Sequence, residues 1–185
     1  MTVDIDERPQ WGETPDAYVR RLAMEKSASA QAAQQFGDAN HQARDAIVLG
    51  ADTAVVIDEA ILGKPADDDD ARRMLQRLSG RTHEVLTGVS LRHQLHEVGT
   101  VERTLVTLAE FRDEDIDWYV QTGEGRGKAG AYAVQGLASR FVQRIDGSYS
   151  NVVGLPIATV YKLLLSLHPV DSRAMLDQVF SRKSL

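Results

Sequence analysis

The sequence has no cysteine among its 185 residues and only five prolines. The absence of cysteine excludes a disulfide framework, a thiolate metal site and a cysteine nucleophile. There is also no run of about 18 consecutive apolar residues, which excludes a membrane-spanning helix. The first seven residues are acidic and lack an apolar stretch, so they are not typical of a signal peptide. We therefore expect a cytoplasmic protein without a membrane partner.

Positive charge is in deficit. Lysine and arginine total 21 against 27 aspartates and glutamates, which gives a formal net charge of −6 with histidine neutral. This balance disfavours a nucleic-acid polymer or an anionic membrane as partner. A nucleotide-sized ligand remains compatible with it, because a few local cations suffice. At about 100–200 residues per domain, the length predicts a single domain over residues 1–185.

Helical and strand-like patterns alternate along the chain, which favours an α/β or α+β domain. Residues 31–45 are polar and predict a fraying helix followed by a loop. In the first half of the chain, the other predicted elements are a helix capped by Thr14, buried strand segments over 46–49 and 54–57, a return strand at 60–62, and a helix from the run Asp67-Asp68-Asp69-Asp70 to Gly80. In the second half they are a hairpin of strands 85–91 and 98–109, a helix over 113–120, a strand over 140–145, a helix over 156–167, and a weak helix or tail over 170–185.

Asp52 follows the apolar run 46–49 at the rim of the predicted sheet, where ligand sites of α/β proteins gather. Its carboxylate could bind a metal ion or take a proton from water. The alternative is a strand-end aspartate that only caps the next turn. Lys64 lies between Gly63 and Pro65, and a rigid turn of this kind can hold an ammonium group for a phosphate. The alternative there is an exposed loop lysine.

Lys26 shares a helix face with Val19 and Leu22. An unpaired lysine on an apolar face is costly, so its ammonium group should either reach solvent or meet an anion. The segment 127–136 is rich in small residues and contains Lys128 and Gln135, which makes it a candidate for substrate binding, because its backbone can approach a ligand closely. A glycine-rich surface loop is the alternative.

Other sequence patterns give weaker evidence about function. The five histidines show no metal-ligand spacing, and no Gly-x-Ser-x-Gly elbow exists, which disfavours a serine hydrolase. The four consecutive aspartates at 67–70 resemble a metal cluster, but four acids at a helix start are more simply explained by the helix dipole and solvation.

Taken in order, short segments spread from residue 6 to about residue 165 make the sequence resemble the Maf family of nucleoside triphosphate pyrophosphatases. Any one of them is weak, whereas the ordered set is highly specific. The segments are Asp6-Glu7, Tyr18-Val19-Arg20-Arg21-Leu22-Ala23-Met24-Glu25-Lys26, Gly50-Ala51-Asp52-Thr53, Leu62-Gly63-Lys64-Pro65, Leu78-Ser79-Gly80 with His83, Thr87-Gly88-Val89, Lys128-Ala129-Gly130-Ala131-Tyr132 with Gln135-Gly136, and Ile145-Asp146-Gly147-Ser148-Tyr149 through Val153-Gly154-Leu155-Pro156.

The resemblance implies a bent mixed sheet flanked by helices, with a cleft between two lobes, often as a homodimer. It implies hydrolysis of a nucleoside triphosphate to the monophosphate and pyrophosphate, assisted by Mg²⁺ or Mn²⁺. The roles it implies are Asp52 as proton acceptor, Glu7 in metal binding and catalysis together with Asp52, Lys26 and Lys64 facing the phosphates, and Thr53 and Gln135 in base selection. The Ala-Asp-Thr and Gln-Gly forms resemble the branch acting on dTTP and UTP, rather than the branch acting on 7-methyl-GTP.

The sequence departs from the family at its beginning. The family's first strand and helix, with a Ser-x-Ser-Pro-Arg-Arg-like motif, have no counterpart before Asp6. Two explanations stay open at this point. One is a start placed at an internal methionine, which the persistence of Glu7, Asp52, Lys64 and Gln135 favours. The other is a shortened, catalytically impaired protein that binds nucleotides and is linked to cell division.

Overall fold

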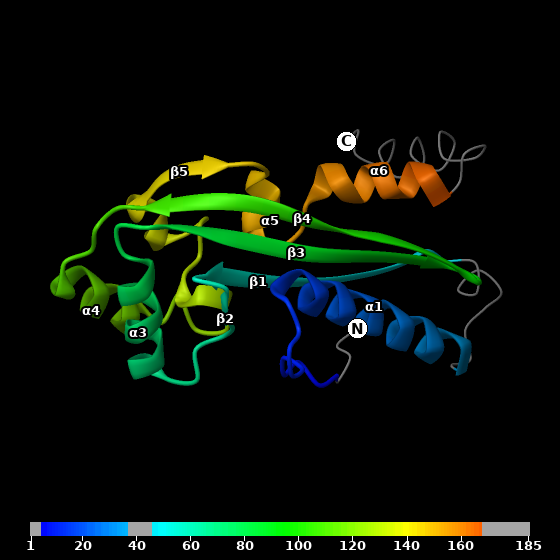
Figure 1. Cartoon of the computed structure of the whole chain (residues 1–185), viewed down its shortest axis with the longest axis horizontal. Helices are drawn as coiled ribbons and strands as arrows, with labels where there is room; N and C mark the ends of the chain where they lie inside the picture. Colours follow the sequence, from blue (N-terminus) through cyan, green and yellow to red (C-terminus); the bar gives the residue numbers. More distant parts are fainter. Residues whose placement is uncertain (1–4, 37–45, 168–185) are drawn as a thin grey trace, which may run out of the picture.

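One five-stranded sheet organises the computed structural model, which describes residues 5–36 and 46–167 (Figure 1). The strands lie in the order β2-β1-β3-β4-β5. Their bounds are β1 Val48–Ile57, β2 Ala60–Leu62, β3 Thr82–His93, β4 His96–Leu108 and β5 Val142–Asp146. The helices are α1 Pro15–Phe36, α3 Asp68–Leu78, α4 Asp113–Thr122, α5 Tyr149–Val153 and α6 Ile157–Leu167, with the short 3₁₀ turns η1 Ala129–Ala131 and η2 Leu137–Phe141.

The predicted α/β fold class is confirmed, and every described strand pair is antiparallel, where the resemblance implied a mixed sheet. Tight turns explain the antiparallel pairing of β1 with β2 and of β3 with β4. Asp58 and Glu59 adopt φ values of 52° and 61°, and Gln94 adopts 53°. Left-handed turn residues match the twist of paired strands and therefore favour two-residue hairpins.

The strand β1 is longer than predicted and has a partly unpaired edge. It runs without interruption through Gly50 and Thr53, joining two segments that the sequence suggested separately. It pairs with β3 from Val48 to Val56 but with β2 only from Val55 to Ile57. Among the residues that the structure describes, no strand therefore pairs with the β2-side edge of β1 before Val55.

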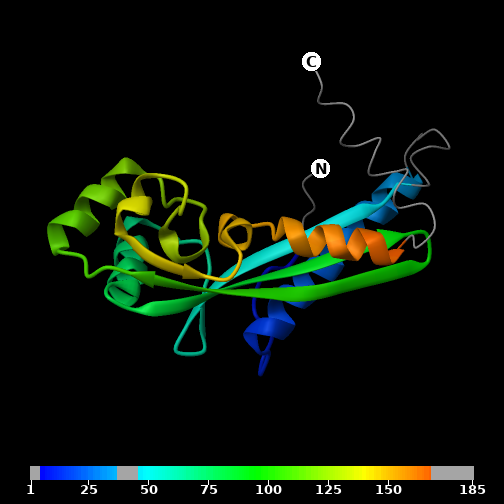
Figure 2. The same ribbon diagram turned by 90° about the horizontal axis from the view of Figure 1, so that it is seen from above.

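Helix α1 lies directly against one face of the sheet (Figures 1 and 2). A Cβ atom on Gly50 would stand 2.2 Å from the Ala23 carbonyl oxygen, and one on Gly88 would stand 2.1 Å from that of Val19. Two glycines therefore permit the close approach that buries Val19 and Leu22 completely. The predicted Thr14 cap is confirmed, since its Oγ1 accepts from the Ala17 amide at 3.3 Å. The helix continues to Phe36, further than the polar composition indicated.

The opposite face is covered in two parts. Helices α3 and α4 and the turn η1 pack at one end of the long strands, and α5 and α6 lie along the other (Figures 1 and 2). The larger apolar core lies at the first of these ends and includes Val55, Leu75, Val85 and Tyr119. The predicted start of α3 in the aspartate run is confirmed, and Asp67 caps the helix by accepting from the Asp70 amide at 2.7 Å. The other three aspartates form ion pairs with arginines.

None of the helices described is long and apolar enough to cross a membrane. The tail or weak helix over 170–185 lies outside the described residues. A single domain over the whole chain stays a prediction.

Candidate functional site

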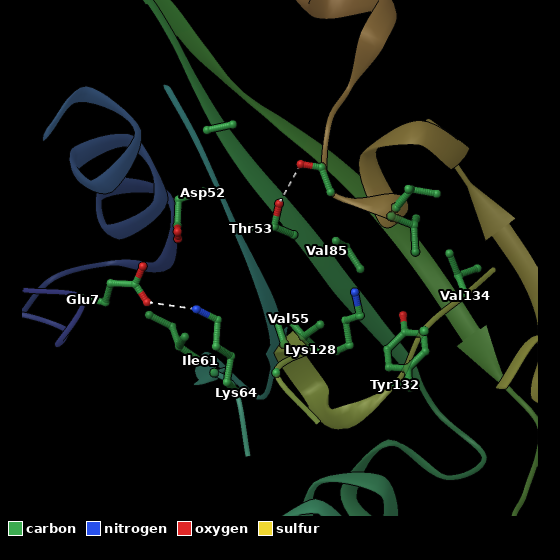
Figure 3. Close-up of a pocket in the computed structure, with 18 of the residues that line it drawn as sticks. Glu7, Asp52, Thr53, Val55, Ile61, Lys64, Val85, Lys128, Tyr132 and Val134 are labelled. Atoms are coloured by element: carbon green, nitrogen blue, oxygen red, sulfur yellow. Dashed lines mark hydrogen bonds and ion pairs between the residues drawn. The ribbon is translucent and has the colours of Figure 1, made fainter. Parts of the chain in front are cut away.

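A cavity of about 640 Å³ opens along the unpaired edge of β1 (Figure 3). The segment before α1 lines one side of it, and residues 127–135 line the other. Successive side chains of a strand point to opposite faces of the sheet. Asp52 therefore points toward α1, and Thr53 points toward α5 (Figure 3). Six of the seven residues singled out from the sequence line the cavity, and the seventh, Lys26, is paired with one of them, Asp52.

Three of those residues form a chain of ion pairs with Asp52 on the α1 side. The Lys26 Nζ lies 2.5 Å from Asp52 Oδ1 and 2.9 Å from Glu7 Oε1. The Lys64 Nζ lies 3.3 Å from Glu7 Oε2 (Figure 3). Of the two alternatives considered for the Lys26 ammonium group, solvent or an anion, the structure shows the anion, because the group contacts two carboxylates. We call Glu7, Lys26, Asp52 and Lys64 the charged wall.

Burial acts differently on the two members of the central pair. It raises the pKa of the Asp52 carboxyl above its ordinary value, because the attraction of Lys26 does not offset the loss of water and the Glu7 charge adds repulsion. Burial opposes the charge of Lys26 as well, but two hydrogen-bonded carboxylates outweigh it and raise the lysine pKa. The hydrogen bond from Lys26 lowers the pKa of Glu7. At the centre of the wall, the Lys26 ammonium group thus stands between an ionised glutamate and an aspartate with raised proton affinity.

The segment that carries Glu7 is fixed from α1. The Tyr18 hydroxyl donates to the Glu7 carbonyl oxygen at 2.9 Å, and an Arg21 amino group donates to the Arg8 carbonyl oxygen at 3.2 Å. Arg8 itself lines the cavity and is held by Asp6 at 2.7 Å. Sequence reasoning missed Arg8 as a cavity residue, although its place directly after Glu7 was a usable signal.

The opposite side of the cavity has little charge. Thr53 donates its hydroxyl hydrogen to the Gly154 carbonyl oxygen at 3.2 Å, and its Oγ1 lies 2.8 Å from that of buried Thr87. A hydroxyl that is engaged in this way fixes the wall and turns less readily to a ligand. Lys128 and Gln135 are exposed cavity residues, and neither forms an ion pair or hydrogen bond with its side chain within the described part of the chain. We call Thr53, Lys128, Tyr132 and Gln135 the neutral wall, after its uncharged majority.

Tyr132 was not singled out from the sequence beyond its place in a matching segment. Its ring forms part of the cavity (Figure 3), and its hydroxyl lies 2.8 Å from Nε2 of His83. His83 is buried, and burial lowers its pKa to about 4. The imidazole is therefore neutral at physiological pH and acts as a hydrogen-bond partner of Tyr132.

The two carboxylates of the charged wall suit a hard divalent cation. No group of three or more histidine, aspartate or glutamate side chains that could hold a metal ion exists among the described residues. Mg²⁺, however, typically binds one or two protein carboxylates and completes its shell with water and substrate phosphates. Glu7 and Asp52, which face one ammonium group from two sides, fit that mode of binding.

Comparison with known proteins agrees with the resemblance. The family described as Maf-like protein matches residues 1–167. The chain is 51% identical over 153 residues to the dTTP/UTP pyrophosphatase of Koribacter versatilis (strain Ellin345), covering 83% of this chain and 75% of that protein. It is 48% identical to the dTTP/UTP pyrophosphatase of Shewanella oneidensis, covering 87% and 80%. For the protein of the same name from Anaeromyxobacter dehalogenans (strain 2CP-C) the identity is 49%, covering 87% and 78%.

Proposed function

The chain belongs to the Maf-like protein family, and from that premise we propose that it is a nucleoside triphosphate diphosphatase that hydrolyses dTTP and UTP to the monophosphate and pyrophosphate. The observation that carries the proposal is the charged wall facing the neutral wall across one cavity. Its volume of about 640 Å³ lies within the range of roughly 300–1,000 Å³ that is usual for small-molecule sites. Similarity to several dTTP/UTP pyrophosphatases over most of the chain supports the choice of substrate.

In the proposed reaction Asp52 is the general base. Its carboxylate accepts a proton from water while the water oxygen forms a bond to the α-phosphorus. The bond from the α-phosphorus to the bridging oxygen breaks, and pyrophosphate leaves with that oxygen. A base is most effective when its pKa approaches the working pH, so the pKa raised by burial suits this role.

The two lysines of the charged wall stabilise the negative charge that builds up on the departing pyrophosphate. Lys64 is the more accessible, with 61% of its side chain exposed against 24% for Lys26. We assign phosphate contact chiefly to Lys64, and to Lys26 the additional task of orienting Asp52 and Glu7. Fixed cations at the site of developing charge are among the strongest contributions to catalysis.

We further propose that a divalent cation, Mg²⁺ or Mn²⁺, assists the reaction. Glu7 and Asp52 are the residues that would hold it. When bound, the cation neutralises phosphate charge and polarises the phosphate oxygens.

The neutral wall is the proposed base-recognition surface. The Gln135 amide offers both N–H donors and a carbonyl acceptor, which complement the ring edge of uracil or thymine. Lys128, the one cation of this wall, is a further proposed substrate-binding residue. Since free nucleoside triphosphates are the substrate, we propose that the protein acts in the cytoplasm, and the resemblance leads us to propose a homodimer.

The test is a product assay on the purified protein with Mg²⁺ or Mn²⁺. We expect dTTP and UTP to give dTMP or UMP together with pyrophosphate, and 7-methyl-GTP to be a poor substrate. Binding of dTTP without hydrolysis would overturn the enzyme proposal and favour a nucleotide-binding protein. Preferred cleavage of 7-methyl-GTP would overturn the substrate assignment alone.

A further inference from the structure

The loop that carries Gln135 is attached to α4 through a buried tyrosine. The Tyr119 hydroxyl accepts from the Ala133 amide at 3.1 Å, two residues before Gln135. The same hydroxyl donates its hydrogen to Glu124 Oε2 at 2.8 Å. Tyr119 is only 1% exposed, so the larger core fixes its ring. The beginning of the loop is thereby fixed to the core.

The end of the loop is attached to Glu124. Its Oε1 accepts from the Leu137 amide at 2.8 Å, and its Oε2 accepts from the Ala138 amide at 3.3 Å. A Cβ atom on Gly136 would stand 1.9 Å from Oε1. Glycine at 136 therefore lets the carboxylate reach the amides that begin the turn η2. These hydrogen bonds outweigh the effect of burial and lower the pKa of Glu124, so the carboxylate is ionised at neutral pH.

Neither Tyr119 nor Glu124 is among the residues that line the cavity. The Gln135 side chain has no hydrogen bond to another described residue, so its position depends on the backbone of the loop. The two anchoring points, at Ala133 and at Leu137 and Ala138, lie on either side of it. Displacements of the order of 1 Å in a substrate-positioning group can reduce the rate about 100-fold.

We propose that Tyr119 and Glu124 form a clamp that sets the position of Gln135 and thereby the choice of a pyrimidine over a larger purine base. This inference rests on the proposed function. Both side chains are positioning residues, because they act through the loop and do not touch the base. A loosened loop would widen the space beside Gln135, weaken the binding of dTTP and admit purine triphosphates more readily.

Two variants test the clamp with little change in volume. Glu124→Gln places an amide nitrogen where a carboxylate oxygen now accepts hydrogen bonds, so at least one donor faces another donor. Tyr119→Phe keeps the ring in the core and removes the hydroxyl. Glu114→Gln is the matched control for the first variant, since its side chain is 85% exposed and it lies on α4, which ends two residues before Glu124. Tyr161→Phe, on α6, is the matched control for the second.

The readouts are kcat and KM for dTTP and dGTP, the unfolding midpoint, and amide hydrogen exchange over 133–138. We expect both clamp variants to raise the KM for dTTP by about tenfold, to leave its kcat within about twofold, and to lower the dTTP-to-dGTP ratio of kcat/KM. Exchange should accelerate over 133–138. The control variants should match the wild type in every readout.

Two results would overturn the clamp. One is faster exchange without any change in KM or in the dTTP-to-dGTP ratio. The other is a parallel fall of kcat, affinity and unfolding midpoint, which indicates a purely structural role. If the wild-type protein hydrolyses neither nucleotide, the proposed function fails separately. Calorimetric binding of dTTP and dGTP then replaces KM, with unchanged binding ratios in the variants as the contradicting result.

Discussion

The two sides of β1 differ in chemistry although they begin at adjacent residues. On the α1 side, Asp52 belongs to a continuous chain of ion pairs with Lys26, Glu7 and Lys64. On the other side, Thr53 engages a backbone carbonyl and a neighbouring hydroxyl. The charged wall is linked within itself, whereas the exposed side chains of the neutral wall are available to a ligand.

Under the proposed function, this difference assigns separate tasks to the two faces of one strand. Alternation along β1 sends consecutive side chains to opposite faces, and the short β2 leaves the edge between them without a strand partner among the described residues. A substrate lying across that edge would meet charge at its phosphates and neutral groups at its base. The expected consequence is that changes in the charged wall act on turnover and changes in the neutral wall act on affinity.

The largest expected effect comes from Asp52→Asn. The asparagine keeps the shape but cannot accept the proton, so kcat should fall by about 10²–10⁴-fold. The KM for dTTP should change by only a few-fold. Steady-state pyrophosphate release measures both constants, and circular dichroism checks the fold. Turnover at the wild-type level would remove Asp52 from its role.

Lys26→Met should act on the charged wall through two losses. It removes a cation near the departing pyrophosphate, which should lower kcat by about 10²-fold. It also removes the attraction that holds down the pKa of Asp52. Activity needs the ionised carboxylate and therefore declines as the pH falls through this pKa. The acid limb of the pH–rate profile should accordingly move to higher pH in the variant, whereas a limb that stays in place would contradict the pairing of Lys26 with the base.

Gln135→Ala, in the neutral wall, should show the kinetic pattern opposite to that of Asp52→Asn. Loss of the amide should raise the KM for dTTP by about tenfold and leave kcat nearly unchanged, because the group holds the base and does not touch the reacting atoms. The same assay as for Asp52→Asn serves here. A fall in kcat at constant KM would show that the two walls do not divide the work in this way.

The smallest expected effect concerns stability beneath the neutral wall. Burial lowers the pKa of His83 from about 6.5 to about 4, so the unfolded chain binds a proton more readily than the folded one. The neutral imidazole therefore contributes fully to the free energy of unfolding above pH 6.5. This contribution falls by about 1–3 kcal/mol as the pH falls toward about 4. Denaturant unfolding across this window should show a smaller loss in His83→Gln. Equal losses in the two proteins would argue against a buried neutral imidazole.

Much of this arrangement could be predicted from residue patterns. The start of α1 at Thr14 and Pro15, the start of α3 in its aspartate run and the hairpin of β3 and β4 follow from local propensities. The unfavourable position of Lys26 on an apolar face left two alternatives, solvent or an anionic partner, and the structure shows the anionic partner. Its pairing with Asp52 across 26 residues could not be derived from spacing, because only the packing of α1 on β1 through Gly50 brings the two together.

The residues that sequence reasoning missed act through backbone hydrogen bonds. Tyr119 lies in the last turn of α4 and Glu124 two residues beyond the helix, and neither gives a periodic signal of its contact with the loop 133–138. His83 was set aside for lack of metal spacing, and its bond to Tyr132 depends on a cross-fold contact that no local pattern encodes. Such contacts become visible only when the fold places a polar side chain beside a distant segment.

The most direct test of the division between the walls is calorimetric titration of dTTP into the Asp52→Asn protein. If the charged wall serves the chemical step, this nearly inactive variant should bind dTTP with a dissociation constant within a few-fold of the wild-type KM. The Gln135→Ala protein, titrated in parallel, should bind about tenfold more weakly. Loss of dTTP binding in Asp52→Asn, with binding retained in Gln135→Ala, would contradict the account.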